Sequence, residues 1–192
     1  MTNVGNLLNT DPLTSARLLL GCNVIKIIGD KKIVAKIVEV EAYDQNDPAS
    51  HSYRGPTKRN EVMFGKPGYA YVYFTYGMHY CLNIVSGELN YGSAVLIRAL
   101  EPLKGIQLIR DNRHQSIKND YQLTNGPAKL CQALDITKAL NGHNLSKSPL
   151  YIEIKEPLEE KSIVRTTRIG IKKATNLKWR LYIKNNPYVS RY

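Results

Sequence analysis

The chain has 192 residues, and 43% of them are hydrophobic, which is enough for one domain with a sizeable core. Lys and Arg total 27 against 16 Asp and Glu, and the resulting charge of +11 makes a polyanion the first class of partner to consider. The three cysteines are far apart and form no Cys-x-x-Cys pair, which argues against a disulfide framework and favours a reducing cytosol. No apolar stretch approaches the ~20 residues of a membrane-spanning helix, and no histidine has metal-ligand spacing. We therefore expect one domain over residues 1–192, with no membrane partner, no metal and no cofactor.

The first third of the chain predicts one helix, one hairpin and a long loop. Asp11 is typical of a helix start, since its carboxylate can cap the first turn, and Gly21 marks the end of that helix. Two runs rich in β-branched residues, 24–28 and 33–43, flank a short turn and predict a hairpin. The polar stretch at 44–66 is long for a compact domain, so we expect a functional loop there.

The remaining elements alternate between strands and helices. A second hairpin is predicted over residues 69–85, where the pattern has period two except at Tyr76 and Gly77. Helices are expected from Pro102 to about residue 113 and from Pro127 onward, because proline favours the first turn of a helix. Further strands are expected at residues 94–100, 150–154, 163–169 and 179–183. This order of elements predicts a mixed α+β domain rather than a regular βαβ winding.

Two carboxylates and a phenol share one face of the strand at 33–43. Glu39, Glu41 and Tyr43 have the same parity and therefore point together. A pair of glutamates is also ordinary where a strand end meets solvent. Here the strand runs into the polar loop that holds His51, and a carboxylate at such a margin can activate water as a general base. The pattern does not choose between Glu39 and Glu41.

Tyrosines are concentrated in the second hairpin, which holds five of the thirteen in the chain. Tyr69, Tyr71 and Tyr73 share one strand face and form either a tyrosine-rich core or a surface on which bases can stack. Buried tyrosines need partners for their hydroxyls, which favours the stacking surface. Tyr76 is predicted at the hairpin tip, where an exposed ring suits a wedge pushed between base pairs.

The last 32 residues are strongly basic, with nine Lys or Arg and no Asp or Glu. Such a run can be a solvated surface, but it alternates with Ile, Val, Trp and Tyr and is typical of a folded segment. We therefore favour a nucleic-acid face over a solvated tail.

Several long blocks of sequence agree with one known family. These are VEVEAY, ASHSYRGPTKRN, MFGKPGYAYVYFTYGMHYCLNIV, VLIRALEP, NGPAKLCQAL and RIGI. Together they resemble the alkyladenine (3-methyladenine) DNA glycosylase family over nearly the whole chain. The resemblance implies a single mixed domain with a curved, mostly antiparallel sheet flanked by helices and a protruding hairpin. It also implies an enzyme that flips a damaged purine and hydrolyses its N-glycosidic bond without a metal or redox cofactor.

The resemblance assigns roles to individual residues. Glu41 resembles the family's water-activating base, and Arg98 matches the residue beside the catalytic water. Tyr76 matches the tyrosine that takes the place of the flipped nucleotide. Asn83 resembles the residue that disfavours guanine by crowding its exocyclic amine. The other pocket residues that the resemblance implies are Tyr43, His51 and Tyr73.

The functional prediction is a monofunctional DNA glycosylase of base excision repair. It would release alkylated or deaminated purines, of the class of 3-methyladenine, hypoxanthine and ethenoadenine, from double-stranded DNA and leave an abasic site. We expect a monomer in the cytoplasm of a bacterial-type cell, associated with the nucleoid. The alternatives are a non-catalytic binder of damaged or bent DNA and, less favoured, a lyase that acts through a lysine Schiff base. The candidates for contact with the DNA backbone are Arg54, Lys58, Arg59, Arg165, Arg168, Lys172 and Lys173.

Overall fold

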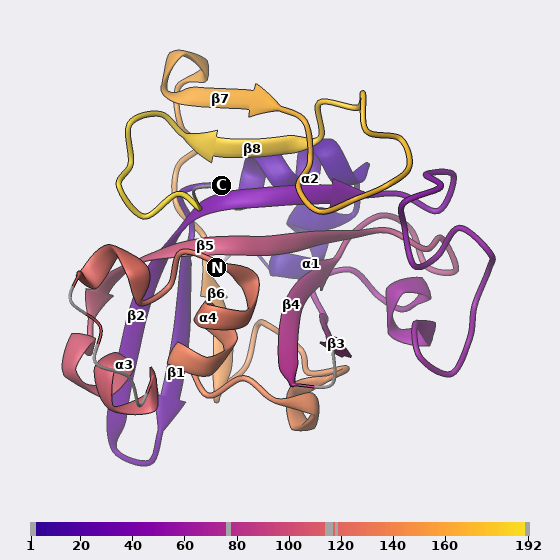
Figure 1. Ribbon diagram of the computed structural model, residues 1–192. Helices are drawn as coiled ribbons and strands as arrows, with labels where there is room; N and C mark the ends of the chain where they lie inside the picture. Colours follow the sequence, from indigo (N-terminus) through magenta and orange to yellow (C-terminus); the bar gives the residue numbers. More distant parts are fainter. Residues whose placement is uncertain (1–2, 76–77, 114–116, 118, 191–192) are drawn as a thin grey trace.

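A curved antiparallel sheet forms the centre of the fold (Figure 1). The structure is a computed structural model that describes residues 3–75, 78–113, 117 and 119–190. The main path through the sheet is β3-β4-β5-β2-β1-β6, while β8 pairs with β2 and β7 pairs with β8. The strands are β1 (Asn23–Ile28), β2 (Lys31–Tyr43), β3 (Ala70–Thr75), β4 (His79–Val85), β5 (Ala94–Lys104), β6 (Leu150–Glu153), β7 (Ile163–Thr166) and β8 (Arg180–Ile183). The predicted mixed α+β class with a mostly antiparallel sheet is confirmed.

Strand β2 is the strand on which the site is built. Its first half pairs with β1 and its second half with β8, while β5 pairs with it along most of its length. Register shifts on either side of Glu39 insert one additional residue into each strand of the β2–β5 pair, Val38 and Arg98. Such bulges bend a sheet and are frequent beside functional sites. The bend lies where the charged residues of the two strands meet.

Four helices accompany the sheet in the described part of the chain. The Asp11 carboxylate accepts hydrogen bonds from the amides of Leu13 at 3.0 Å and Thr14 at 2.9 Å, which confirms the predicted start of the first long helix. Helix α2 packs on β2 and β5, and α4 packs on β4, β5 and α3. No helix among the described residues is long and apolar enough to cross a membrane. The helices are α1 (Val4–Leu8), α2 (Pro12–Leu19), α3 (Ile106–Arg113) and α4 (Pro127–Ala133).

One face of the sheet forms the hydrophobic core together with the helices. Because side chains alternate along a strand, every second residue of β2 to β5 enters this core. The residues between them point to the opposite face, which is where polar and aromatic side chains gather. The core members from the four strands include Val40, Ala42, Ala70, Val72, Leu82, Ile84, Val95 and Ile97.

Two predicted boundaries are wrong. Pro102 does not begin a helix, because β5 continues to Lys104 and Pro102 lies opposite Ala35 of β2 beside a register shift. Proline is tolerated in a strand at such an irregularity. Gly105, with φ +79°, then separates the strand from α3. The strand predicted at 163–169 ends at Thr166, and the segment that follows it turns toward the site described below. The short helix α1 was not predicted.

Candidate active site

A pocket of about 550 Å³ opens on the face of the sheet opposite the core. Four adjacent strands line it with alternate residues, which is the period-two pattern expected from the sequence. His51 of the loop after β2 and residues 169–173 of the segment between β7 and β8 also line it, together with Pro48, Ala49, Met63 and Pro127. The strand residues are Glu41 and Tyr43 from β2, Tyr71, Tyr73 and Thr75 from β3, Cys81 and Asn83 from β4, and Leu96 and Arg98 from β5.

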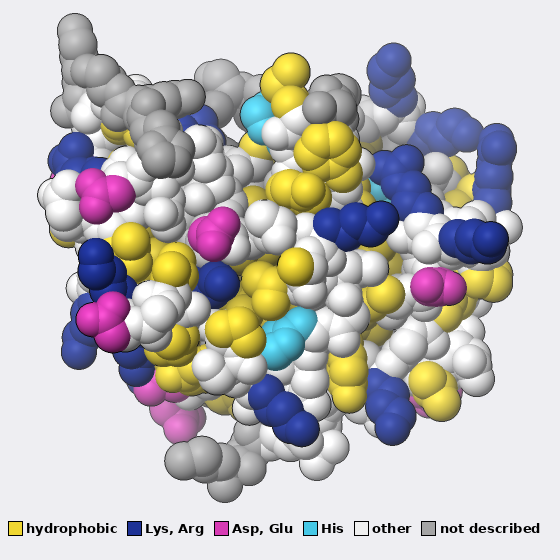
Figure 2. Space-filling model, turned by 90° about the horizontal axis from the view of Figure 1, so that it is seen from below, with side chains coloured by type: hydrophobic (Ala, Val, Ile, Leu, Met, Phe, Trp, Pro, Cys, Tyr) yellow, Lys and Arg dark blue, Asp and Glu magenta, His cyan; other side chains and the backbone are white. Residues whose placement is uncertain are grey.

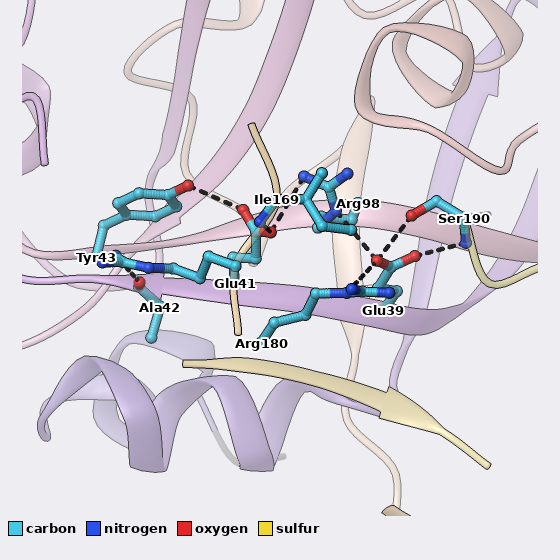
Figure 3. A network of polar contacts seen from close by, with 9 residues as sticks. Glu39, Glu41, Ala42, Tyr43, Arg98, Ile169, Arg180 and Ser190 are labelled. Carbon is cyan, nitrogen blue, oxygen red and sulfur yellow. Dashed lines mark hydrogen bonds and ion pairs between the residues drawn. The ribbon is translucent and has the colours of Figure 1, made fainter. Parts of the chain in front are cut away.

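Glu41 is the one acidic residue among the described residues that line the pocket. Its side chain is buried and is held from two sides (Figure 3). Oε1 accepts a hydrogen bond from the Ile169 amide at 2.8 Å and lies 3.2 Å from Nη1 of Arg98, while Oε2 accepts from the Tyr43 hydroxyl at 2.8 Å. A carboxylate offers about four acceptor positions. The three contacts orient Glu41, and the residues that the structure describes leave one acceptor position of Oε2 for a further donor such as water.

Glu39 is surrounded by donors and does not line the pocket. Its Oε1 lies 3.1 Å from Nε of Arg98 and 2.8 Å from Nε of Arg180, and it also accepts from the Ser190 hydroxyl at 2.8 Å. Its Oε2 accepts from the Ser190 amide at 2.7 Å. Figure 3 shows the two glutamates on either side of Arg98. The contacts of Glu39 therefore hold the fold together. The alternative that the two glutamates lie at a strand end facing solvent is wrong, because both side chains are fully buried.

The aromatic residues of the pocket divide into a wall and its support. Tyr73 is half-buried, and the ring centroid of His51 lies 4.6 Å from the Tyr73 centroid. Tyr71 is 1% exposed, and its hydroxyl lies 3.0 Å from Nδ1 of His51. Tyr69 packs, like Tyr73, against a small hydrophobic cluster that contains Tyr71, but it does not line the pocket. Of the three tyrosines expected to form a stacking face, Tyr73 alone is placed to offer its ring to a base.

Burial keeps the pocket phenols protonated. It raises the pKa of Tyr71 to about 12, and it raises the pKa of Tyr43 further, with the Glu41 carboxylate adding to the effect. The pKa of Tyr73 is raised mainly by burial and then by its neighbour Cys81. Partial burial lowers the pKa of His51, and the positive charge of Arg59 lowers it further. At neutral pH the aromatic side chains of the pocket are therefore uncharged.

Asn83 lies on the floor of the pocket and is 5% exposed. Its side-chain amide donates to the main-chain oxygen of Tyr71 at 3.1 Å, across the β3–β4 pair. This hydrogen bond fixes the orientation of the amide group. No cluster of three or more His, Cys, Asp or Glu side chains suited to a metal ion is found among the described residues.

Comparisons with known proteins identify the family of the chain. The sequence profile described as methylpurine-DNA glycosylase matches residues 6–187. A protein of Carboxydothermus hydrogenoformans is 55% identical over 94% of both chains, and one of Methanoculleus marisnigri is 48% identical over 94% of both. A protein of Francisella tularensis is 45% identical over the full length of both chains. All three carry 3-methyladenine DNA glycosylase as a provisional name.

The chain belongs to the methylpurine-DNA glycosylase family. It is a DNA glycosylase, a hydrolase that acts on N-glycosidic bonds in DNA, which confirms the prediction of an enzyme over a non-catalytic binder. Its substrate is therefore DNA, and its basic residues have a polyanion to contact.

The exposed basic residues predicted to contact DNA in this glycosylase fall into two groups, those that line the pocket and those that do not. Figure 2 shows a group of Lys and Arg side chains at the upper right of the face that it presents, and others at the left edge and at the bottom. Lys172 and Lys173 are exposed and line the pocket itself. The other exposed candidates for contact with the DNA backbone are Arg54, Lys58, Arg59 and Arg165.

Arg168 is a correction, because we expected it to contact the DNA backbone. Its side chain is fully buried and paired with Asp47. The guanidinium lies between the rings of Tyr43 and Trp179, with Cζ 4.6 Å and 5.3 Å from their centroids. A group in this position cannot reach a phosphate. From the sequence we grouped Arg168 with the surface charges, because a sequence does not show which basic side chain faces inward.

Sequence reasoning missed several contacts that hold the site, which involve the Ile169 amide, Ser190 and Asp47. The Ile169 amide is a main-chain group, so the RIGI block marked its position without indicating its contact. Ser190 and Asp47 had no signal in the sequence, because their partners lie far away along the chain. Tyr76, the expected wedge, lies outside the described residues.

Proposed function

We propose that the enzyme is a monofunctional glycosylase that releases alkylated or deaminated purines from double-stranded DNA and leaves an abasic site. The observation that carries this proposal is Glu41, a buried carboxylate at the pocket with one acceptor position open on Oε2. The named relatives support the purine class through the word 3-methyladenine in their names. The charge of +11 supports a monomer that associates with nucleoid DNA in the cytoplasm.

Glu41 acts as the general base in this mechanism. It takes a proton from a water molecule, and the water oxygen attacks the anomeric carbon of the deoxyribose as the bond to the purine nitrogen breaks. The ionised carboxylate also stabilises the positive charge that develops on the sugar. Arg98, Tyr43 and the Ile169 amide hold the carboxylate in place before the reaction, so little reorganisation is needed when the water attacks.

The damaged base would be held by the uncharged aromatic side chains of the pocket. Tyr43 and Tyr73 offer aromatic faces to the purine, and His51 lies against Tyr73. Asn83 presents a fixed amide at the floor, where it would crowd the exocyclic amine of guanine. Lys172 and Lys173 lie at the pocket and would contact the phosphates beside the flipped nucleotide. Damaged bases also flip more easily because they unstack at lower cost.

The test is single-turnover base release from duplexes that carry hypoxanthine or ethenoadenine, measured as alkali-labile strand breaks. Glu41→Gln should reduce the rate by about 10²- to 10⁴-fold, because the amide cannot accept the proton of water. Lesion binding should persist, since the walls of the pocket are unchanged. Glu153→Gln, on an exposed position of β6, is the matched control and should release bases at the wild-type rate. Base release by Glu41→Gln at the wild-type rate would overturn the proposal.

A further inference from the structure

Arg168 and Asp47 form a buried ion pair behind the pocket. Both side chains are fully buried, and Nη1 of Arg168 donates to the Asp47 carboxylate and, at 2.9 Å, to the main-chain oxygen of Ala42. Burying two charges costs free energy even when they are paired, so such a pair is weak support for stability alone. Neither residue lines the pocket. Any contribution of the pair to the reaction must therefore pass through its neighbours.

The first neighbour is Tyr43. The Arg168 guanidinium lies 4.6 Å from the centroid of the Tyr43 ring and 5.3 Å from that of Trp179. Nε and Nη2 of Arg168 are buried and have no hydrogen-bond acceptor among the described residues, so these contacts with the rings take the place of acceptors. A planar guanidinium suits this position between two rings better than an ammonium group does. Arg168 thus supports the Tyr43 ring from a side that does not line the pocket.

The second neighbour is Ile169, which follows Arg168 in the chain. Its amide donates to Oε1 of Glu41 at 2.8 Å (Figure 3). Residues 167–179 contain no helix or strand, so side-chain and main-chain contacts must fix this segment. Ala42, between Glu41 and Tyr43 on β2, accepts from Arg168 and donates its own amide to the Trp179 oxygen at 2.8 Å. Both ends of the segment are thereby attached to one residue of β2.

The third neighbour is the loop that follows β2. Asp47 belongs to this loop, and the loop also carries His51 to the pocket. The ion pair therefore joins the loop after β2, the end of β2 and the segment before β8 at one buried point. Each of these three parts of the chain contributes a residue to the site.

We propose that Arg168, held by Asp47, is a positioning residue for base release. It sets the Ile169 amide on Glu41 and the Tyr43 ring beside the base at the same time. The inference rests on the proposed function, in which Glu41 activates water. A displacement of about 1 Å at a reacting group can cost ~10²-fold in rate, so a small movement of this segment is enough to slow the reaction.

The experiment compares Arg168→Lys and Arg168→Met with the wild type in single-turnover base release from a hypoxanthine duplex, at saturating enzyme and with lesion affinity measured separately. Arg113→Lys is the matched control, because Arg113 is as buried as Arg168, at 6% exposure, and lies in α3 away from the pocket. Arg168→Lys should slow the saturated rate by ~10- to 100-fold and change the affinity much less. Arg113→Lys should lower the thermal midpoint of unfolding about as much as Arg168→Lys does, and it should leave the saturated rate unchanged.

Trp179 gives a second readout, because it is the only tryptophan in the chain. The Arg168 variants should change its fluorescence emission, whereas the Arg113 variant should not. A saturated rate for Arg168→Lys within twofold of the wild type, with altered Trp179 emission, would overturn the positioning role. Glu41→Gln, measured in parallel, separates the two proposals. If it is inactive while Arg168→Lys is fully active, the positioning inference alone fails, and if it is active the proposed function fails.

Discussion

His51 is a titratable residue of the pocket whose surroundings favour the neutral form of its ring. Its Nδ1 lies 3.0 Å from the Tyr71 hydroxyl, and its ring forms a T-shaped contact with the ring of Tyr73. Partial burial, followed by the charge of Arg59, lowers the pKa of His51 from its ordinary value of 6.5. A neutral imidazole has a physical consequence for the substrates proposed here, because it does not repel a purine that carries a positive charge after alkylation.

The lowered pKa of His51 predicts a pH dependence of stability. Between pH 6.5 and the lower folded pKa, the unfolded chain binds more protons at this residue than the folded protein does. The free energy of unfolding should therefore fall as the pH decreases below 6.5. His51→Gln should flatten this slope in urea denaturation series between pH 5 and 6.5. Above pH 7 the slope should be the same in both proteins, and an unchanged slope below pH 6.5 would contradict the assignment.

Glu39 acts at the scale of the elements, because it joins strands that are distant in sequence. Its carboxylate binds Arg98 of β5, Arg180 of β8 and Ser190 in the segment after β8. These contacts lie at the bulge where β2 exchanges β1 for β8 as its neighbour. The network keeps Arg98 in place between the two glutamates, so the stability of the sheet and the geometry of the site depend on one residue.

Removing Glu39 should therefore be costly for folding. Glu39→Ala removes the buried carboxylate that Arg98 and Arg180 share and should lower the free energy of unfolding by about 3–5 kcal/mol. Urea denaturation followed by circular dichroism measures this. Glu101→Ala is the control, because Glu101 pairs with Lys36 at 3.1 Å in a partly exposed position and should cost at most ~1 kcal/mol. Equal losses in the two variants would show that the network contributes little.

The charge of the whole molecule determines how it meets DNA. The net charge of +11 is concentrated in the last part of the chain, yet one of those charges is buried beside Tyr43 and cannot contact DNA. The charges that matter for binding are the exposed ones. Lys172 and Lys173 are exposed and line the pocket.

DNA binding should weaken steeply as salt increases, and these two lysines should contribute to the slope. The double variant Lys172→Gln, Lys173→Gln should reduce the slope of log K against log salt by up to about 2, since each neutralised phosphate contributes about 0.9. Fluorescence anisotropy on an undamaged duplex at several salt concentrations measures this. A control with Lys155→Gln and Lys161→Gln removes two exposed lysines that do not line the pocket. If the control variant reduces the slope as much as the pocket variant does, the prediction that Lys172 and Lys173 contact DNA phosphates is wrong.

The sequence by itself determined which residues of one strand point to the same side of the sheet. Alternation along a strand is a local property, so Glu41 with Tyr43 and the tyrosines of β3 could be grouped before the fold was known. The resemblance then chose Glu41 over Glu39. The same local reasoning placed the start of α2 at Asp11, because capping depends on neighbouring residues.

Only the tertiary structure decided which charges are buried and what holds them. Asp47 and Arg168 are 121 residues apart, and no local pattern links them. Pro102 has the local signature of a helix start, but pairing with β2 keeps it in β5. The difference between Glu39 and Glu41 likewise depends on Ser190 and Ile169, which reach the sheet from the end of the chain. Propensity and parity act over a few residues, whereas burial and pairing depend on segments that meet only after folding.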